Sequence, residues 1–188
     1  DECPCGGKLA EGAAPCTPVL PPQVIKPKRS TEVLLLESPA ATEVLQNEFI
    51  VGATGELIDE RIFAPLNALD PAEQYSKADY HVANAVICWP PKGTSAADWN
   101  EAVRCCRPRL SRELAAVRPA GVLAAGSRAA QAVIGDSRIS KLVGAPVAGA
   151  DFYEGGRTKG TCVASFSGLT VLPSFHPAAT FDHRTPAL

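Results

Sequence analysis

Residues 32–37, Glu-Val-Leu-Leu-Leu-Glu, decide the fold class. An unbroken apolar run has no solvent-facing side, so it is typical of a strand that is buried on both faces. The segment Ser38-Pro39-Ala40-Ala41 ends the run at once. Comparable apolar segments at 81–88, 121–125 and 169–175 predict three further buried strands. The sequence therefore predicts a sheet of parallel type.

Segments with helical spacing lie between these strands. We expect helices over 54–66, 95–117 and 128–134, and a Gly-rich insertion over 144–168. The longest of them presents one apolar face, made of Ala102, Cys106, Leu110, Leu114 and Val117. Alternating strands and helices predict an α/β fold, namely a three-layer α/β/α sandwich around a short, mainly parallel four-stranded sheet.

Composition narrows the function classes. The chain has 188 residues, 46% of them hydrophobic, and a net charge of −2, which fits one globular domain without a general basic surface. No apolar run approaches the roughly 18 residues of a membrane span, and no signal peptide opens the sequence, so we expect no membrane partner and a cytoplasmic location in a bacterial or virus-infected cell. Residues 1–30 form a Cys/Pro-rich arm before a domain at 31–188.

Three polar residues lie at or near the ends of the expected strands. Glu37, Asn84 and His176 lie where the carboxyl ends of parallel strands meet, which is where such sheets place their sites. Each also has an ordinary interpretation. The glutamate suits a cap or an ion pair, the asparagine a backbone partner, and the histidine before Pro177 a turn.

Seven cysteines are many for this length, and no secretory signal favours disulfides. Metal ligation is therefore favoured. Four thiolates suit either an iron–sulfur cluster or zinc, and a set of buried free cysteines is the alternative.

Four segments, in order, resemble known motifs. They are Leu35 to Glu43 followed by Val51-Gly52 and Gly55, then Asn84 to Pro91, then Cys106 to Leu110 with Glu113-Leu114, and finally Ser174-Phe175-His176-Pro177-Ala178. Together they resemble the uracil-DNA glycosylase superfamily, nearest its iron–sulfur family 4 branch. The resemblance covers about residues 31 to 182 and implies removal of uracil, or a related base, from DNA by hydrolysis of the N-glycosidic bond.

The resemblance also implies roles for individual residues. Asn84 would recognise uracil through its amide, His176 would donate to the leaving base, and Glu37 would position water near the sugar. Further substrate contacts would come from the turn after the first strand and the segment that follows it, namely Ser38, Pro39, Ala40, Glu43, Phe49 and Ile50.

The chain departs from the family pattern at several positions. Leu36 and Ala40 stand where the family has glycines, and Ile50 aligns with the aromatic residue that stacks on uracil. The neighbouring Phe49 replaces that ring only through a shift of register. These departures favour the alternative function, a non-catalytic glycosylase-like module that binds single-stranded DNA within a replication protein such as a viral DNA polymerase.

Family 4 members hold a [4Fe–4S] cluster through cysteines. The resemblance assigns Cys88 and Cys106 to it, with Cys105 as a neighbouring choice, and draws the remaining ligands from Cys3, Cys5 and Cys16. Zinc would use the same residues. The absence of any Met and the stop shortly after His176 also lead us to expect that the chain is part of a longer protein, with replication proteins or a fused polymerase as partners.

Overall fold

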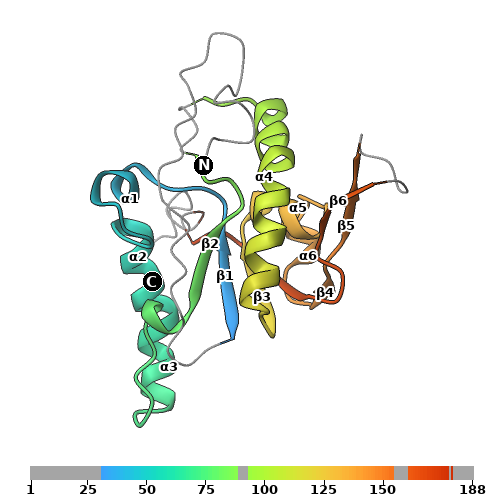
Figure 1. Ribbon diagram of the computed structural model, residues 1–188. Coiled ribbons are helices and arrows are strands. Elements are labelled where there is room, and N and C mark those ends of the chain that lie inside the picture. Colours follow the sequence, from blue (N-terminus) through green and yellow to red (C-terminus); the bar gives the residue numbers. More distant parts are fainter. Residues whose placement is uncertain (1–30, 89–92, 155–160, 178, 180–188) are drawn as a thin grey trace.

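The computed structural model describes residues 31–88, 93–154, 161–177 and 179. Its centre is a sheet in the order β2-β1-β3-β7-β4 (Figure 1). The first four strands are parallel to one another, and the last pairs antiparallel with β7. Their bounds are β1 (Glu32–Leu36), β2 (His81–Asn84), β3 (Gly121–Ala125), β7 (Thr170–Ser174) and β4 (Val147–Ala148).

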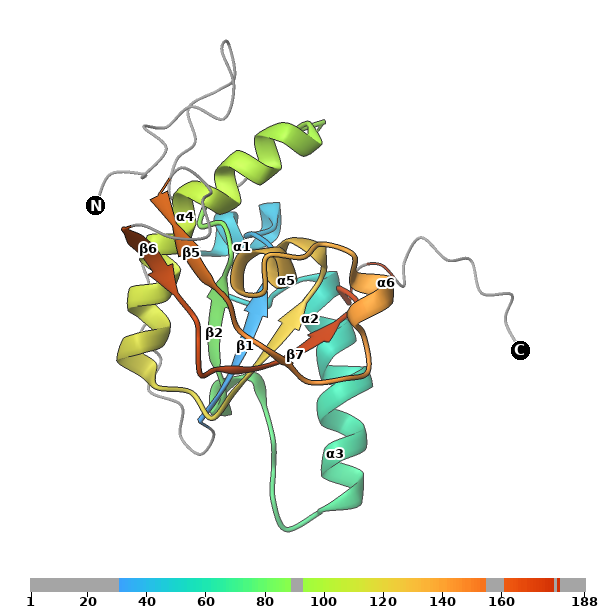
Figure 2. The same cartoon turned by 90° about the vertical axis from the view of Figure 1, so that its right-hand side faces the viewer.

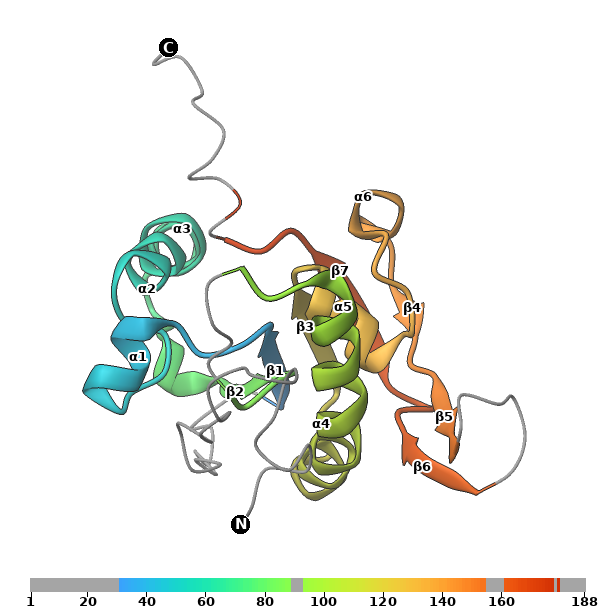
Figure 3. The same ribbon diagram turned by 90° about the horizontal axis from the view of Figure 1, so that it is seen from above.

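Helices cover both faces of this sheet. On one face lie α4 (Ala96–Val117) and α5 (Ser127–Val133), and on the other a continuous helical segment made of α2 (Ala53–Ile58), a π-helical turn (Asp59–Phe63) and α3 (Ala64–Leu69) (Figures 2 and 3). The short helix α1 (Ala41–Gln46) follows β1. The predicted α/β fold with a mainly parallel sheet is confirmed.

The apolar run of β1 explains the three layers. Val33 and Leu35 face the core under α4 and α5, whereas Leu34 and Leu36 face the core under α2 and α3. Because β1 pairs with β2 on one side and β3 on the other, all four side chains are buried. The continuous hydrophobic pattern is therefore the signature of a central strand.

The helix expected at 54–66 is longer and less regular than the sequence suggests. It runs through residues 53–69 and widens into a π-helical turn just before Pro65. Proline has no N–H to donate to the preceding turn, so a regular α-helix cannot continue through this position undisturbed. The wider turn accommodates it without ending the helix.

The second strand is shorter than predicted. It ends at Asn84 instead of continuing to Cys88. Beyond that point the chain bends but stays bonded to the loop after β1, with the Ala85 N–H donating to the Leu36 carbonyl at 2.9 Å and the Val86 N–H to the Glu37 carbonyl at 3.0 Å. The residues of 85–88 are apolar and largely buried, which is why the sequence pattern extends past the strand.

The insertion at 144–168 contains structure of its own. It supplies the edge strand β4 and a two-stranded antiparallel sheet of β5 (Asp151–Tyr153) and β6 (Cys162–Ser165), after the short helix α6 (Ile139–Leu142). Phe166 at its end is buried in the core under α4 and α5. Among the described residues, no helix is both long and apolar enough to cross a membrane.

The packing of α4 on the sheet predicts the response to mutation. Leu110 is 0% exposed in this core, so Leu110→Ala should destabilise the fold by about 2–5 kcal/mol through lost burial and a cavity. Leu69→Ala, at a leucine 84% exposed, should change the free energy of unfolding by less than about 0.5 kcal/mol. Urea denaturation measures both, and equal effects would contradict the packing described.

Candidate functional site

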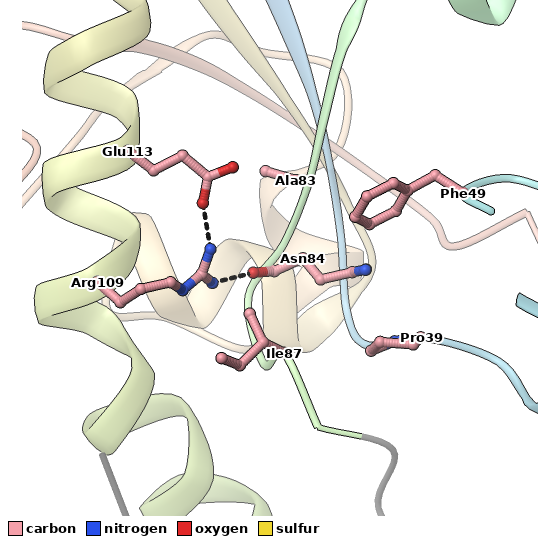
Figure 4. Close-up of a pocket in the computed structure, with 7 residues that line it drawn as sticks. All are labelled: Pro39, Phe49, Ala83, Asn84, Ile87, Arg109 and Glu113. Atoms are coloured by element: carbon pink, nitrogen blue, oxygen red, sulfur yellow. Dashed lines mark hydrogen bonds and ion pairs between the residues drawn. The ribbon is translucent and has the colours of Figure 1, made fainter. Parts of the chain in front are cut away.

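A pocket lies at the carboxyl ends of β1 and β2. It is lined by Pro39, Phe49, Ala83, Asn84, Ile87, Arg109 and Glu113 (Figure 4). These residues come from the loops after β1, from the end of β2 and from α4, which are far apart in the sequence. The sheet topology brings them together at the edge where parallel sheets bind ligands.

Asn84 is the most unusual residue of this pocket. Its side chain is 3% exposed, and neither Nδ2 nor Oδ1 has a hydrogen-bond partner among the described residues. Figure 4 shows the amide extending toward Phe49. A buried amide without partners costs on the order of 1–3 kcal/mol for each unmet group, so Nδ2 and Oδ1 are the atoms of this pocket that are available to a polar ligand.

Phe49 owes its place in the pocket to the backbone of the next residue. Ile50 has a φ of 54°, a left-handed conformation that β-branched residues rarely adopt, and its side chain is 1% exposed in the core under α2. The strained backbone sends Ile50 inward and leaves Phe49 at the pocket wall. Gly55 permits this, because a Cβ there would lie 2.2 Å from the Ile50 carbonyl oxygen.

Two side chains hold this strained segment. The carboxylate of Glu43, which is buried, accepts from the Ile50 N–H through Oε1 and from the Ala40 N–H through Oε2, both at 2.6 Å. Lys77 donates from Nζ to the Ile50 carbonyl at 3.0 Å. Glu43 therefore ties the turn after β1 to the loop that carries Phe49.

Glu37 lies at the start of α5. Its Oε1 accepts from the Arg128 N–H at 2.9 Å and from the Ser127 hydroxyl at 3.3 Å. A Cβ on Gly126 would lie 2.4 Å from that oxygen, so the glycine, at a φ of 106°, makes room for the carboxylate.

His176 follows β7 and is half-buried. Burial lowers its pKa below the ordinary value of 6.5, and the negative charges of Glu37 and Glu43 oppose this only in part. Because β7 and β1 are both parallel to β3, His176 after β7 and Glu37 after β1 lie at the same carboxyl edge of the sheet. At neutral pH the ring is therefore uncharged and able to donate one N–H.

A partly buried charged cluster forms the α4 side of the pocket. Glu113 forms an ion pair with Arg109 and contacts Nε2 of His81 at 3.0 Å, while Arg109 donates through Nη2 to the main-chain oxygen of Asn84 (Figure 4). Nε of Arg109 is buried and has no partner among the described residues. The cluster joins α4 to β2 directly beneath the amide of Asn84.

The residues predicted from the sequence divide into three groups. Pro39, Phe49 and Asn84 line the pocket. Glu37, Ser38, Ala40, Glu43 and His176 do not line it: the first three follow β1, Glu43 lies on α1 and His176 follows β7, and Ile50 faces the core. The sequence prediction gave no site role to Ala83, Ile87, Arg109 and Glu113. The last three lie in the segments that carry the motif resemblance, and this was the signal that could have found them.

The cysteines predicted as ligands are only partly described. Cys88 and Cys106 are both 0% exposed and belong to the same core cluster, whereas Cys3, Cys5 and Cys16 lie outside the described residues. Within the described part of the chain, no group of three or more metal-ligating side chains occurs. Cys88 is disulfide-bonded, a state that is an alternative to thiolate ligation.

The sheet order and the pocket at its carboxyl edge define an α/β domain whose candidate site lies where parallel sheets bind ligands. Residues 22–187 match the family model of the uracil DNA glycosylase superfamily, and the chain belongs to this superfamily. No individual curated protein matches the chain at a significant level.

The environment of His176 predicts its titration. The midpoint of its imidazole signals in a pH series of NMR spectra should lie below 6.5, with His176→Gln as the control that removes them. Because the unfolded chain binds the proton more readily, stability should fall as pH drops from 6.5 through the lower folded pKa. A midpoint above 6.5 would mean that attraction by Glu37 and Glu43 outweighs burial.

Proposed function

We propose that this protein is a DNA glycosylase that removes uracil from DNA by hydrolysing the N-glycosidic bond. The observation that carries the proposal is the buried, unpartnered amide of Asn84 facing the ring of Phe49 in a pocket at the edge of the sheet. Membership of the superfamily supports the reaction class.

The amide suits uracil better than cytosine. Its Nδ2 donates to the O4 carbonyl and its Oδ1 accepts from N3–H, which are neighbouring groups on the uracil ring. Cytosine presents an amino group and an unprotonated N3 at the same positions, so each contact would oppose donor to donor or acceptor to acceptor. A buried site that leaves polar groups unmatched rejects the wrong ligand strongly.

Phe49 supplies the stacking surface that the family pattern places one residue later. Stacking of a base on an aromatic ring contributes roughly 1–3 kcal/mol. The left-handed backbone of Ile50 and its ties to Glu43 and Lys77 support the exchange of roles between these neighbours. The substitution at the aligned position is therefore compatible with activity.

His176 and Glu37 act on the bond that breaks. As the bond lengthens, negative charge gathers on the uracil ring, and the neutral imidazole of His176 donates to O2 to stabilise it. The lowered pKa of His176 keeps the ring in this neutral form. Positive charge gathers on the sugar, where the carboxylate of Glu37 stabilises it and orients the attacking water.

The target base has to leave the helical stack to enter such a pocket. The substrate is therefore uracil-containing DNA, with single-stranded or already unpaired positions costing least to bind. Partners in replication, including a fused polymerase, stay a prediction from the sequence.

Activity on a uracil-containing oligonucleotide tests the proposal. Alkali cleavage after incubation should reveal excision by the wild type, and Phe49→Ala should lower kcat/KM by about 5- to 150-fold through lost stacking. His176→Ala should lower it by roughly 10²–10³. Leu45→Ala, at an exposed leucine of α1, serves as the matched control and should leave activity unchanged.

The same experiment decides between the two functions considered. A wild type that binds single-stranded DNA but releases no uracil would contradict the glycosylase proposal and support the non-catalytic module.

We also propose the iron–sulfur subtype, with Cys88 and Cys106 among the ligands and the rest drawn from Cys3, Cys5 and Cys16. Two cysteines buried together in the core support it. The cluster would hold the N-terminal arm to the domain.

Protein purified without oxygen should then absorb broadly near about 400 nm. Cys88→Ala should abolish the absorbance and lower the melting temperature, whereas Cys162→Ala, at an exposed cysteine, should change neither. Stoichiometric zinc in a colourless protein would favour the zinc alternative, and a colourless protein without metal would favour the disulfide.

A further inference from the structure

The peptide that follows Asn84 is fixed from both sides. Its carbonyl oxygen accepts from Nη2 of Arg109 on α4, and its N–H, that of Ala85, donates to the Leu36 carbonyl at 2.9 Å. Because the peptide group is planar and hydrogen-bonded at both its oxygen and its N–H, these two bonds fix its orientation. Its orientation sets the direction in which the Cα–Cβ bond of Asn84 points.

Arg109 is itself held by a partly buried partner. Glu113 lies one turn later on α4. Its Oε2 accepts a hydrogen bond from Nη1 of Arg109, and its Oε1 contacts Nε2 of His81. His81 lies on the same strand as Asn84, three residues earlier, and is buried. The cluster therefore clamps β2 at two points, and Arg109 reaches the main chain at the pocket.

The cluster is poorly suited to stability alone. Nε of Arg109 remains a buried donor without a partner among the described residues. Apolar side chains of similar size often stabilise a core as well as a buried ion pair does. A planar guanidinium is needed where one group has to contact a carboxylate and a carbonyl at once, which a lysine ammonium does with less defined geometry.

We propose that Arg109 is a positioning residue for base recognition: through the Asn84 main-chain oxygen it aims the Asn84 amide at the base, and Glu113 and His81 hold it in place. The proposal rests on the proposed function, because the aimed amide is the group that reads uracil. Arg109 acts through Asn84 and needs no contact with the base.

The main test separates positioning from stability. In the double variant Arg109→Met/Glu113→Gln the glutamine still accepts from His81, and no charge is left buried. Its melting temperature should therefore stay near that of the wild type. The side-chain amide signals of Asn84 in a ¹⁵N correlation spectrum, identified by their loss in Asn84→Asp, should nevertheless shift. On uracil-containing DNA, kcat/KM should fall about 10- to 100-fold, since misplacement of a recognition group is costly.

Two further variants complete the set. Arg109→Lys keeps the charge and should lower kcat/KM by an intermediate amount. If the double variant does not fold, the same measurements are made on this variant. Arg104→Met is the matched control: this arginine lies on the same helix with its side chain 64% exposed and pairs with Glu101, so amide signals and kinetics should be unchanged.

The outcomes are distinguishable. Unchanged Asn84 signals and a kcat/KM within twofold of the wild type in the folded double variant would overturn the proposal, as would a loss of activity that only follows melting temperature across the set. If the wild type releases no uracil, the proposed function fails, whereas the Asn84 signals still decide whether Arg109 positions the amide.

Discussion

Two hydrogen bonds beyond the ladder of β1 and β2 organise the site. The Ala85 and Val86 N–H groups donate to the carbonyls of Leu36 and Glu37, so the two chains stay in register after regular strand pairing has ended. An acid at the end of one strand and an amide at the end of the next are thereby held at one edge. The pocket, the turn after β1 and the contact with α5 all depend on this shared edge.

The pocket and its supporting loop contain several features that lower the stability of the fold. Asn84 keeps two unmet polar groups, Arg109 keeps one, and Ile50 has a left-handed backbone. Each feature costs of order 1–3 kcal/mol, and all lie within one pocket and its supporting loop. Costs of this kind persist in proteins when a function requires them, which is why we assign the ligand site here rather than elsewhere on the sheet.

Much of the fold follows from the sequence because burial leaves a readable pattern. The unbroken apolar run of β1 predicted a central strand, and the apolar face of α4 predicted its length to within one residue. The hydrophobic pattern gave wrong strand or helix limits where buried residues do not belong to a regular element. Residues 85–88 are largely buried without continuing the strand, and the helix at 53–69 widens before Pro65 for a reason that hydrophobic spacing does not register.

Part of the pocket lining was predictable from the sequence, but the contacts that support it were not. Asn84 and Phe49 followed from motif order and residue type, although the choice of Phe49 over Ile50 required the backbone conformation. Arg109 and Glu113 lie in a segment of the motif resemblance but were given no role, because charged residues on a long helix usually face solvent. Only the three-dimensional arrangement shows that this pair points toward β2, and that its arginine reaches the main chain rather than water.

The central claim is that the Asn84 amide and the Phe49 ring hold a uracil base. A crystal structure with a single-stranded oligonucleotide that carries 2′-fluoro-2′-deoxyuridine, whose glycosidic bond resists hydrolysis, tests it most directly. The account predicts the uracil ring against Phe49, with O4 and N3 about 3 Å from the Asn84 amide. A base bound elsewhere while the pocket stays empty, or a base whose edge faces away from Asn84, would contradict it.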